Sequence, residues 1–527
     1  MTIIGDCVQA IGALLAGISV TQALVAITIV LVYVYYQLTK HYGVFEKQGL
    51  FSIPPQFLFG NAKDLILQKT PMITFFRDIY EKFGNHGYGI YYDGISPTLF
   101  VKDPELIKTI AIKDFDHFTD LAFIPEQLAH LPMNEFGLAN ALGDEWRALK
   151  SSISPAFSLK NMKNIATSIN APALDLIESL KKVPHDEVLV EKYAGYFAMD
   201  CIGRIVFSMD FQTAKSEGNE FVRHGDNFFE VWRFALSSML PQVSKIFNIS
   251  VFNPKSVEYF LKLTAGVLNG RDKSRIQAND VLGLMMKIRD QNLTAEEAGQ
   301  EHSEDDYATK KAMASQLMTN DMINRTLMQF FMDGYDTVSA VTTMSLYYLA
   351  TNPEVQDKAV EEVDRIASRV GANITGEEVN ELKYVDQVFQ ETARMAPFAF
   401  TLRRCTKDYK LQGTDATITK GMNVMFPIVA LHYDPKYFPE PEHFDPERFS
   451  PENRSQIVPG SYIPFGLGPR ECIGMKIAKM EAKILLYQIL RNFRLEPCAQ
   501  TKIPVQWRTD HFNRIEGGCY LKLVPRY

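Results

Sequence analysis

The sequence has few cysteines, and their spacing excludes several kinds of protein. Six cysteines occur in 527 residues, none in a Cys-x-x-Cys pair, and they are scattered along the chain (Cys7, Cys201, Cys405, Cys472, Cys498 and Cys519). A disulfide framework or a cysteine-ligated iron–sulfur cluster needs a denser arrangement. We therefore expect the chain to lie in a reducing compartment.

An excess of basic residues, internal repeats and flexible linkers are also missing. The net charge is -7, so the chain has no electrostatic basis for binding nucleic acid. No Gly/Ser-rich or Pro-rich linker divides residues 50–527. The length alone suggests about three or four domains. We nevertheless predict one large domain over residues 62–527, preceded by a membrane anchor over 1–40 and a proline-containing hinge over 41–61.

One long hydrophobic run lies near the N-terminus. From Ile11 to Tyr36 the sequence has no charged residue, and this run is long enough to cross a bilayer core of about 30 Å. Lys40 and Lys47 follow the run and Asp6 precedes it, so the positive-inside rule places the rest of the chain in the cytosol. The alternative is a cleaved signal peptide, which normally has a basic segment and a small-residue cleavage site.

One cysteine lies where a metal ligand is expected. The stretch 465–474 places Cys472 on a glycine-containing loop directly before apolar residues with helical spacing. A helix N-terminus favours the thiolate, which is the metal-binding form. Gly468 permits a turn that directs backbone N–H groups at the sulfur, and Gly474 allows close approach of a flat cofactor. The alternative is a buried free cysteine beside a Gly-Pro turn.

Two other side chains of this stretch fit a cofactor site. Arg470 can neutralise an acidic edge of the cofactor, and Phe465 can cover the other side of the sulfur. We therefore predict that Cys472 binds an iron ion within a flat cofactor.

The stretch resembles a known family signature. It matches the haem-binding pattern Phe-x-x-Gly-x-Arg-x-Cys-x-Gly of the cytochrome P450 family at every fixed position. The resemblance covers residues 50–527, and the run 403–478 is most similar to the clan of vertebrate drug-oxidising and arthropod detoxifying enzymes. It implies a fold that is mainly α with small β-sheets (α+β), and haem b with Cys472 as the axial iron ligand.

Three more residues match family positions that hold the haem propionates. Trp146 and Lys150 correspond to a Trp-x-x-x-Arg motif, and Arg403 aligns with an arginine that pairs with a propionate. Lys150 departs from the pattern, because lysine neutralises a carboxylate without the bidentate geometry of arginine. For the first motif, the alternative is a surface Trp146-Arg147 pair.

A strongly helical pattern from Asn320 to about Asn352 contains the family's oxygen-activating sequence. The resemblance implies that Asp336 and Thr337 deliver the protons that split the O–O bond of dioxygen. We expect Gly334 to leave room for oxygen and water beside the iron.

Asp333 departs from most relatives, which have alanine or glycine at this position. It lies four residues before Thr337 and so shares its helix face. The similar fatty-acid ω-hydroxylases have a glutamate here that can esterify a haem methyl group. We count Asp333 among the candidate catalytic residues and leave three alternatives open: a covalent ester to haem, a polar anchor for a basic or hydroxylated substrate, or a solvent-facing residue without a role.

A charge cluster is expected to fix the loop that surrounds the haem. Glu391 and Arg394 lie at i and i+3 on a helical segment, which alone is a weak signal. Arg448 completes the family's Glu-Arg-Arg cluster, whose role is structural and not catalytic. Between these motifs, Phe398 and Phe400 are candidate substrate contacts.

Two hairpins are predicted from alternating strand patterns. The first runs from Tyr88 to Val101 around an Asp93-Gly94 turn. The second joins Ile503–Trp507 to Tyr520–Val524 near the C-terminus.

Together these features predict a haem-thiolate mono-oxygenase that inserts one atom of O2 into a lipophilic small molecule such as a xenobiotic, a steroid or a fatty acid. The sequence has no Gly-x-Gly-x-x-Gly fingerprint and no fused flavin region. Electrons from NADPH are therefore expected to come from a separate membrane-bound flavoprotein reductase. Its docking face is expected to include five basic residues (Arg147, Lys150, Lys476, Lys479 and Lys483).

The predicted location is the endoplasmic reticulum membrane, with a single span and the catalytic domain facing the cytosol. Two alternative functions are a haem isomerase or dehydratase of the same fold, and a haem-binding carrier without turnover. The Asp336-Thr337 pair argues against both.

Overall fold

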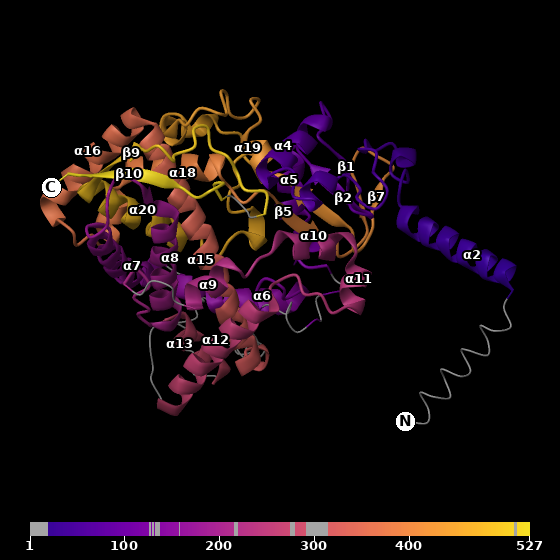
Figure 1. The fold of residues 1–527 in the computed structure, drawn as a ribbon, viewed down its shortest axis with the longest axis horizontal. Coiled ribbons are helices and arrows are strands. Elements are labelled where there is room, and N and C mark those ends of the chain that lie inside the picture. Colours follow the sequence, from indigo (N-terminus) through magenta and orange to yellow (C-terminus); the bar gives the residue numbers. More distant parts are fainter. Residues whose placement is uncertain are drawn as a thin grey trace.

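A computed structural model gives the fold of the chain. It describes residues 19–526 apart from 126–127, 129–130, 132–136, 158, 216–219, 275–279, 291–314 and 511–513. Residues 11–18 of the predicted membrane span, and Cys7, lie outside the described residues. Figure 1 shows the arrangement of the helices and strands.

Helix α15 (Asn320–Thr351) lies at the centre of the helical part of the fold (Figure 1). Thr319 caps its N-terminus, where the hydroxyl oxygen accepts a hydrogen bond of 3.1 Å from the N–H of Met322. Most of α15 is buried, because four long helices pack against it: α8 (Val190–Phe207), α12 (Pro254–Ser274), α18 (Lys383–Met395) and α20 (Met475–Asn492). The helix predicted from Asn320 to about Asn352 is therefore confirmed.

The other helices, apart from α2, surround this group or cover the sheets. They are α2 (Val20–Thr39), α3 (Lys63–Ile66), α4 (Met72–Lys82), α5 (Pro104–Lys108), α6 (Gly143–Ile153), α7 (Leu159–Leu180), α9 (Glu220–Asp226), α10 (Val231–Met239), α11 (Pro241–Ile246), α13 (Val281–Arg289), α16 (Pro353–Val370), α17 (Gly376–Glu381) and α19 (Ile428–His432).

The strands of the described residues form three small sheets. Their orders are β1-β2-β8-β5-β3, β4-β10-β9 and β6-β7. The strands are β1 (Tyr88–Asp93), β2 (Ser96–Val101), β3 (Asp120–Leu121), β4 (Val188–Leu189), β5 (Thr401–Arg404), β6 (Tyr409–Lys410), β7 (Thr417–Ile418), β8 (Asn423–Phe426), β9 (Phe493–Pro497) and β10 (Tyr520–Pro525). Long helices with small sheets confirm the predicted fold class, mainly α with small β-sheets.

One predicted hairpin is confirmed and the other is wrong. β1 and β2 pair antiparallel, with Asp93 opposite Ser96 across the turn. Near the C-terminus, β10 pairs with β9 and β4, while Trp507 makes only an isolated bridge to Ile515. Pro504 has no N–H to donate to a ladder, which is unfavourable for a strand over 503–507.

Helix α2 extends away from the rest of the chain (Figure 1). It has no buried residue and is long and apolar enough to cross a membrane. The following segment, predicted as a hinge, is attached to β1. The N–H of Ile53 donates to the carbonyl of Ile90 at 3.1 Å, and the N–H of Asn61 donates to the carbonyl of Tyr92 at 2.8 Å. These bonds connect the segment after α2 to the first sheet.

Candidate functional site

The Cys472 loop is held by its own backbone. The N–H of Cys472 donates to the carbonyl of Phe465 at 2.9 Å, and α20 begins three residues later at Met475. Gly468 has a φ of 77°, and a Cβ there would lie 2.1 Å from the carbonyl oxygen of Ala111. Only glycine therefore fits this turn, which presents the sulfur in front of the helix.

Burial determines the proton affinity of this sulfur. Desolvation raises the pKa of the Cys472 thiol to about 11, although a backbone hydrogen bond from Gly474 and the charge of Lys150 lower it. The backbone hydrogen bond from Gly474 acts in the direction expected for a helix N-terminus, but desolvation is the larger effect in the metal-free chain. A bound metal cation would reverse the balance and remove the proton.

The accessible surface of Cys472 faces inward. By area the residue is exposed, yet its thiol is strongly desolvated by the surrounding protein. A residue can have accessible surface and still be desolvated if its side chain borders an internal space and not the outer surface of the protein. The carboxylate of Asp333 on α15 acts electrostatically on the same thiol. Cys472 and the Asp333 face of α15 therefore lie on two sides of this internal space.

Asp333 and Thr337 lie together on that face of α15. The hydroxyl of Thr337 donates to the backbone carbonyl of Asp333 at 2.5 Å, and Gln329 Nε2 donates to Asp333 Oδ2 at 3.0 Å. Burial raises the pKa of Asp333 to about 6, with a further contribution from Asp336. The carboxyl group is exposed by area but desolvated, so it too faces the internal space. Desolvation of the carboxyl disfavours the solvent-facing alternative, and this alternative, the ester and the substrate anchor all stay predictions.

Asp336 has a partner that the sequence analysis missed. Arg514 is buried, and its Nη2 lies 2.5 Å from Asp336 Oδ1. The other terminal nitrogen of this arginine, Nη1, lies 3.1 Å from both Glu191 Oε1 and Ser339 Oγ. No motif marks Arg514, since it is far from α15 in the chain and reaches Asp336 only through the tertiary fold.

Gly334 does not open space beside Cys472. A Cβ at this position would lie 2.7 Å from Cδ1 of Ile202 on α8. The missing side chain therefore allows close packing of α15 against α8, and the prediction of room for oxygen and water at Gly334 is wrong.

Trp146 and Arg470 stack beside the Cys472 loop. Trp146 is buried on α6, and the guanidinium carbon of Arg470 lies 3.9 Å from the centre of its ring. Arg470 Nε donates to the carbonyl of Thr119 and Nη2 to that of Ala141, each at 2.7 Å. Lys150, one turn after Trp146, contacts the carbonyl of Pro469. The alternative of a surface tryptophan pair is therefore wrong.

Arg403 reaches the same loop from β5. It is fully buried, and its Nη2 donates to the carbonyl of Leu467 at 3.3 Å. Within the described residues its Nε has no hydrogen-bond partner. Burial lowers the pKa of Arg403 to about 10, that of Arg470 to about 9, and also that of Lys150. We refer to Arg403, Arg470 and Lys150 as the cationic cluster.

The cationic cluster has too little negative charge around it. Among the described residues, Arg470 of this cluster forms an ion pair with Asp120 at 3.9 Å. Arg403 and Arg470 also act on one another as like charges. Buried cations in this arrangement are favourable when anionic groups bind between them.

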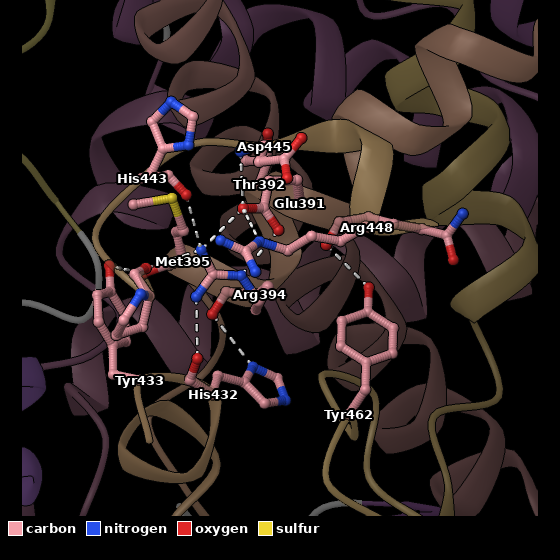
Figure 2. A network of polar contacts seen from close by, with 12 residues as sticks. Glu391, Thr392, Arg394, Met395, His432, Tyr433, His443, Asp445, Arg448 and Tyr462 are labelled. Carbon is pink, nitrogen blue, oxygen red and sulfur yellow. Dashed lines mark hydrogen bonds and ion pairs between the residues drawn. The ribbon is translucent and has the colours of Figure 1, made fainter. Parts of the chain in front are cut away.

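Glu391, Arg394 and Arg448 form a buried network (Figure 2). Arg394 Nε and Nη2 donate to the two carboxylate oxygens of Glu391 at 2.7 and 2.8 Å. Arg448 Nε lies 3.5 Å from Glu391 Oε1, which also accepts a hydrogen bond of 3.0 Å from the N–H of Asp445. Burial raises the pKa of Glu391, and Arg394 opposes this shift. The structure thus brings these three predicted residues together.

His432 connects this network to the segment before the Cys472 loop and was not predicted. Its Nδ1 donates to the carbonyl of Arg394 at 3.1 Å, and its Nε2 accepts the N–H of Ile463 at 3.0 Å. Both contacts require the neutral ring with its proton on Nδ1. Burial lowers the pKa of His432 to about 3, so the ring is neutral at physiological pH.

The predicted aromatic residues occupy different environments. Phe465 is half-buried and stacks on Phe389 of α18, with ring centres 6.2 Å apart. Phe400 is buried, with its ring centre 4.8 Å from that of Phe76 and 5.8 Å from that of Phe398, which is half-buried. These contacts are core packing, and the predicted contacts of Phe398 and Phe400 with substrate stay a prediction.

The five basic residues proposed for docking are not equivalent. Lys483 is buried, and burial lowers its pKa to about 8, so it is unsuitable for a docking face. Lys150 belongs to the cationic cluster. Lys476 is exposed, while Lys479 is half-buried and lies 3.2 Å from Asp386.

Comparisons with known proteins agree with this geometry. Over residues 52–523 the chain matches the family model described as Cytochrome P450. Cytochrome P450 9e2 of Blattella germanica is 32% identical over 528 residues, which cover 95% of this chain and 97% of that protein. Cytochrome P450 6B1 of Papilio polyxenes is 31% identical over 508 residues, with coverages of 95% and 99%.

A mammalian relative extends the comparison. Cytochrome P450 3A41 of Mus musculus is 31% identical over 518 residues, with coverages of 96% of this chain and 97% of that protein. The similarity thus spans the described fold, including the Cys472 loop and α15, and the resemblance found in the sequence is confirmed. The chain therefore belongs to the cytochrome P450 family of haem mono-oxygenases.

Proposed function

We propose that this chain inserts one atom of O2 into a lipophilic small molecule, with electrons from NADPH delivered by a separate membrane-bound flavoprotein reductase. The observation that carries the proposal is the position of Cys472 opposite the Asp333 and Thr337 face of α15. Membership of the family supports mono-oxygenation, and the electrostatic proximity of Asp333 to Cys472 supports a shared site for these residues.

The residues around this space fit haem b. Its two propionates would neutralise the cationic cluster and give the Nε of Arg403 a partner. Cys472 would supply the thiolate, Gly468 would maintain the turn of its loop, and Gly474 would allow close packing of the flat ring. Trp146, which stacks on Arg470, would help to hold a propionate. When bound, haem supplies the iron at which the O–O bond of dioxygen is broken.

The protein's own residues would control protons at this centre. Thr337 Oγ1 lies on the internal face of α15 and can pass a proton into the internal space. The side chain of Asp336 keeps 47% of its surface accessible while Arg514 fixes one oxygen, so its carboxylate can exchange protons with water. In the proposed proton path, Thr337 therefore takes the inner position and Asp336 takes the outer position.

The helix α2 supports a location at the endoplasmic reticulum membrane, with the residues after it in the cytosol. A reductase on the same membrane would dock near the start of α20, where Lys476 and Lys479 lie on the side of the Cys472 loop. The boundaries proposed from sequence, 1–40 for the anchor, 41–61 for the hinge and 62–527 for the catalytic domain, belong to the same proposal.

The deciding experiment is the difference spectrum of the dithionite-reduced protein with carbon monoxide. We expect a strongly red-shifted Soret band that disappears in Cys472→Ala and persists in Cys498→Ala, a matched control at another cysteine. A band typical of histidine-ligated haem would overturn the proposal. NADPH consumption with added reductase then distinguishes a mono-oxygenase from an isomerase, a dehydratase or a haem carrier.

A further inference from the structure

We propose that Asp333 selects substrates that have a protonated amine, and that it binds this amine on the α15 face opposite Cys472. The inference rests on the proposed function and specifies its substrate class. In this inference Asp333 binds the substrate and does not form a covalent ester with haem.

The carboxyl group of Asp333 has no cationic partner among the described residues. Its side chain accepts a hydrogen bond of 3.0 Å from the neutral amide of Gln329. Asp336, three residues later, lies 2.5 Å from Arg514 instead. The two acids of α15 thus differ. Asp336 is paired with a cation of the protein, whereas Asp333 can pair with a cationic group that enters the internal space.

The position of Asp333 makes a bound cation the best complement. The group is desolvated and still mostly ionised at neutral pH, because its pKa is raised only to about 6. A desolvated carboxylate with one neutral donor lacks compensation for lost hydration. A protonated amine supplies both the opposite charge and a charge-assisted hydrogen bond, whereas a hydroxyl supplies only a neutral donor.

Gln329 contributes a second element of the site. It is buried one turn before Asp333, and its Oε1 accepts the N–H of Ala139 at 3.0 Å. This bond fixes the amide so that its Nε2 points at one oxygen of Asp333. The other oxygen, Oδ1, accepts no hydrogen bond from the described residues and is the predicted partner of the amine.

The test compares two ligands that differ at one atom. One is a lipophilic tertiary amine, and the other is the same molecule with C–H in place of the nitrogen. Their dissociation constants are measured by equilibrium dialysis against the haem-loaded wild-type protein, Asp333→Asn, Asp333→Glu and Asp93→Asn. Asp93 is a matched control, because burial also raises the pKa of its carboxyl to about 6 but it lies on β1.

We expect the wild-type protein to bind the amine about tenfold more tightly than the neutral analogue. The preference should disappear in Asp333→Asn, persist in Asp93→Asn and be partly retained in Asp333→Glu. A quaternary ammonium analogue, which has no lone pair for iron and no N–H to donate, should keep the part of the preference that comes from charge, and this part should also disappear in Asp333→Asn. Equal binding of the two ligands by the wild-type protein, or an unchanged preference in Asp333→Asn, would overturn the inference.

Haem retention on denaturing chromatography tests the competing ester. Quantitative release of free haem supports a carboxylate that is available to substrate. Acid-resistant haem that is lost in Asp333→Asn would show that an ester has consumed the charge. The carbon monoxide spectrum of the same samples separates the two proposals, since a red-shifted band without amine preference overturns only the substrate class.

Discussion

Arg514 holds the carboxylate of Asp336, with 2.5 Å between Nη2 of the arginine and Oδ1 of the acid. Arg514 lies between β9 and β10 and is buried, while Asp336 belongs to the central helix. The same guanidinium also contacts Glu191 at the start of α8. One arginine thus joins three segments at the outer side of the proposed proton path.

Replacing Arg514 with Met should affect both stability and coupling. It leaves Glu191 and Asp336 without their cation, which should lower the free energy of unfolding by about 1–3 kcal/mol. With Asp336 no longer positioned, product formed per NADPH consumed should fall several-fold. Arg514→Lys retains the charge, so its stability and its coupling should lie between those of the wild-type protein and those of Arg514→Met. Unchanged unfolding and unchanged coupling in Arg514→Met would contradict this role.

Arg403→Met should separate stability from haem binding. Since Arg403 is fully buried and its Nε lacks a partner among the described residues, methionine removes a desolvated charge. We expect the haem-free protein to be unchanged or more stable by about 1–2 kcal/mol. Transfer of haem to a haem-scavenging protein should become about tenfold faster, because a propionate loses a charged partner. Strong destabilisation of the haem-free variant would instead indicate a structural role.

Arg394→Ala should give protein that lacks haem. Removal of this arginine breaks two charged hydrogen bonds to the buried Glu391 and leaves only the longer contact with Arg448, which costs about 3–5 kcal/mol of stability. Arg448→Ala should also lose haem but destabilise less, since the Arg448–Glu391 distance is 3.5 Å. The haem-to-protein ratio and urea unfolding measure both effects. Arg369→Ala, which removes an exposed pair with Glu381, should change neither quantity.

His432 should make the fold sensitive to acid. Because burial lowers its pKa to about 3, the unfolded chain binds this proton below a pH of about 6.5 while the folded chain does not. His432 therefore costs no stability above that pH, and stability falls as the pH decreases from about 6.5 towards 3, by at most about 1.4 kcal/mol per pH unit.

The matched measurement is urea unfolding of the wild-type protein and His432→Gln at pH 7.5 and 5.5. Asp333 and Asp93 act in the opposite direction, since burial raises the pKa of each to about 6, so only the difference between the two proteins reports on His432. The variant should lose less stability on acidification. Equal losses would show that protonation of His432 does not limit the folded state.

Local sequence patterns were sufficient for several parts of this protein. The helix from Asn320 and the hairpin around Asp93 follow from the spacing of apolar residues and from turn residues, which act over a few positions. The position of Cys472 before a helix is local in the same sense, whereas the glycine requirement at 468 also depends on the close approach of the distant Ala111. The family followed from these same residues, because its signature is a continuous stretch of ten.

Only the tertiary structure decided which charges have partners. Arg514 and His432 carry no motif, and each reaches its partner across a long separation in the chain. The raised pKa of the Cys472 thiol, the burial of Lys483 and the contrast between Asp333 and Asp336 all depend on desolvation by surrounding segments. Desolvation is set by packing between distant residues, whereas the sequence determined the residue types and local elements that this packing brings together.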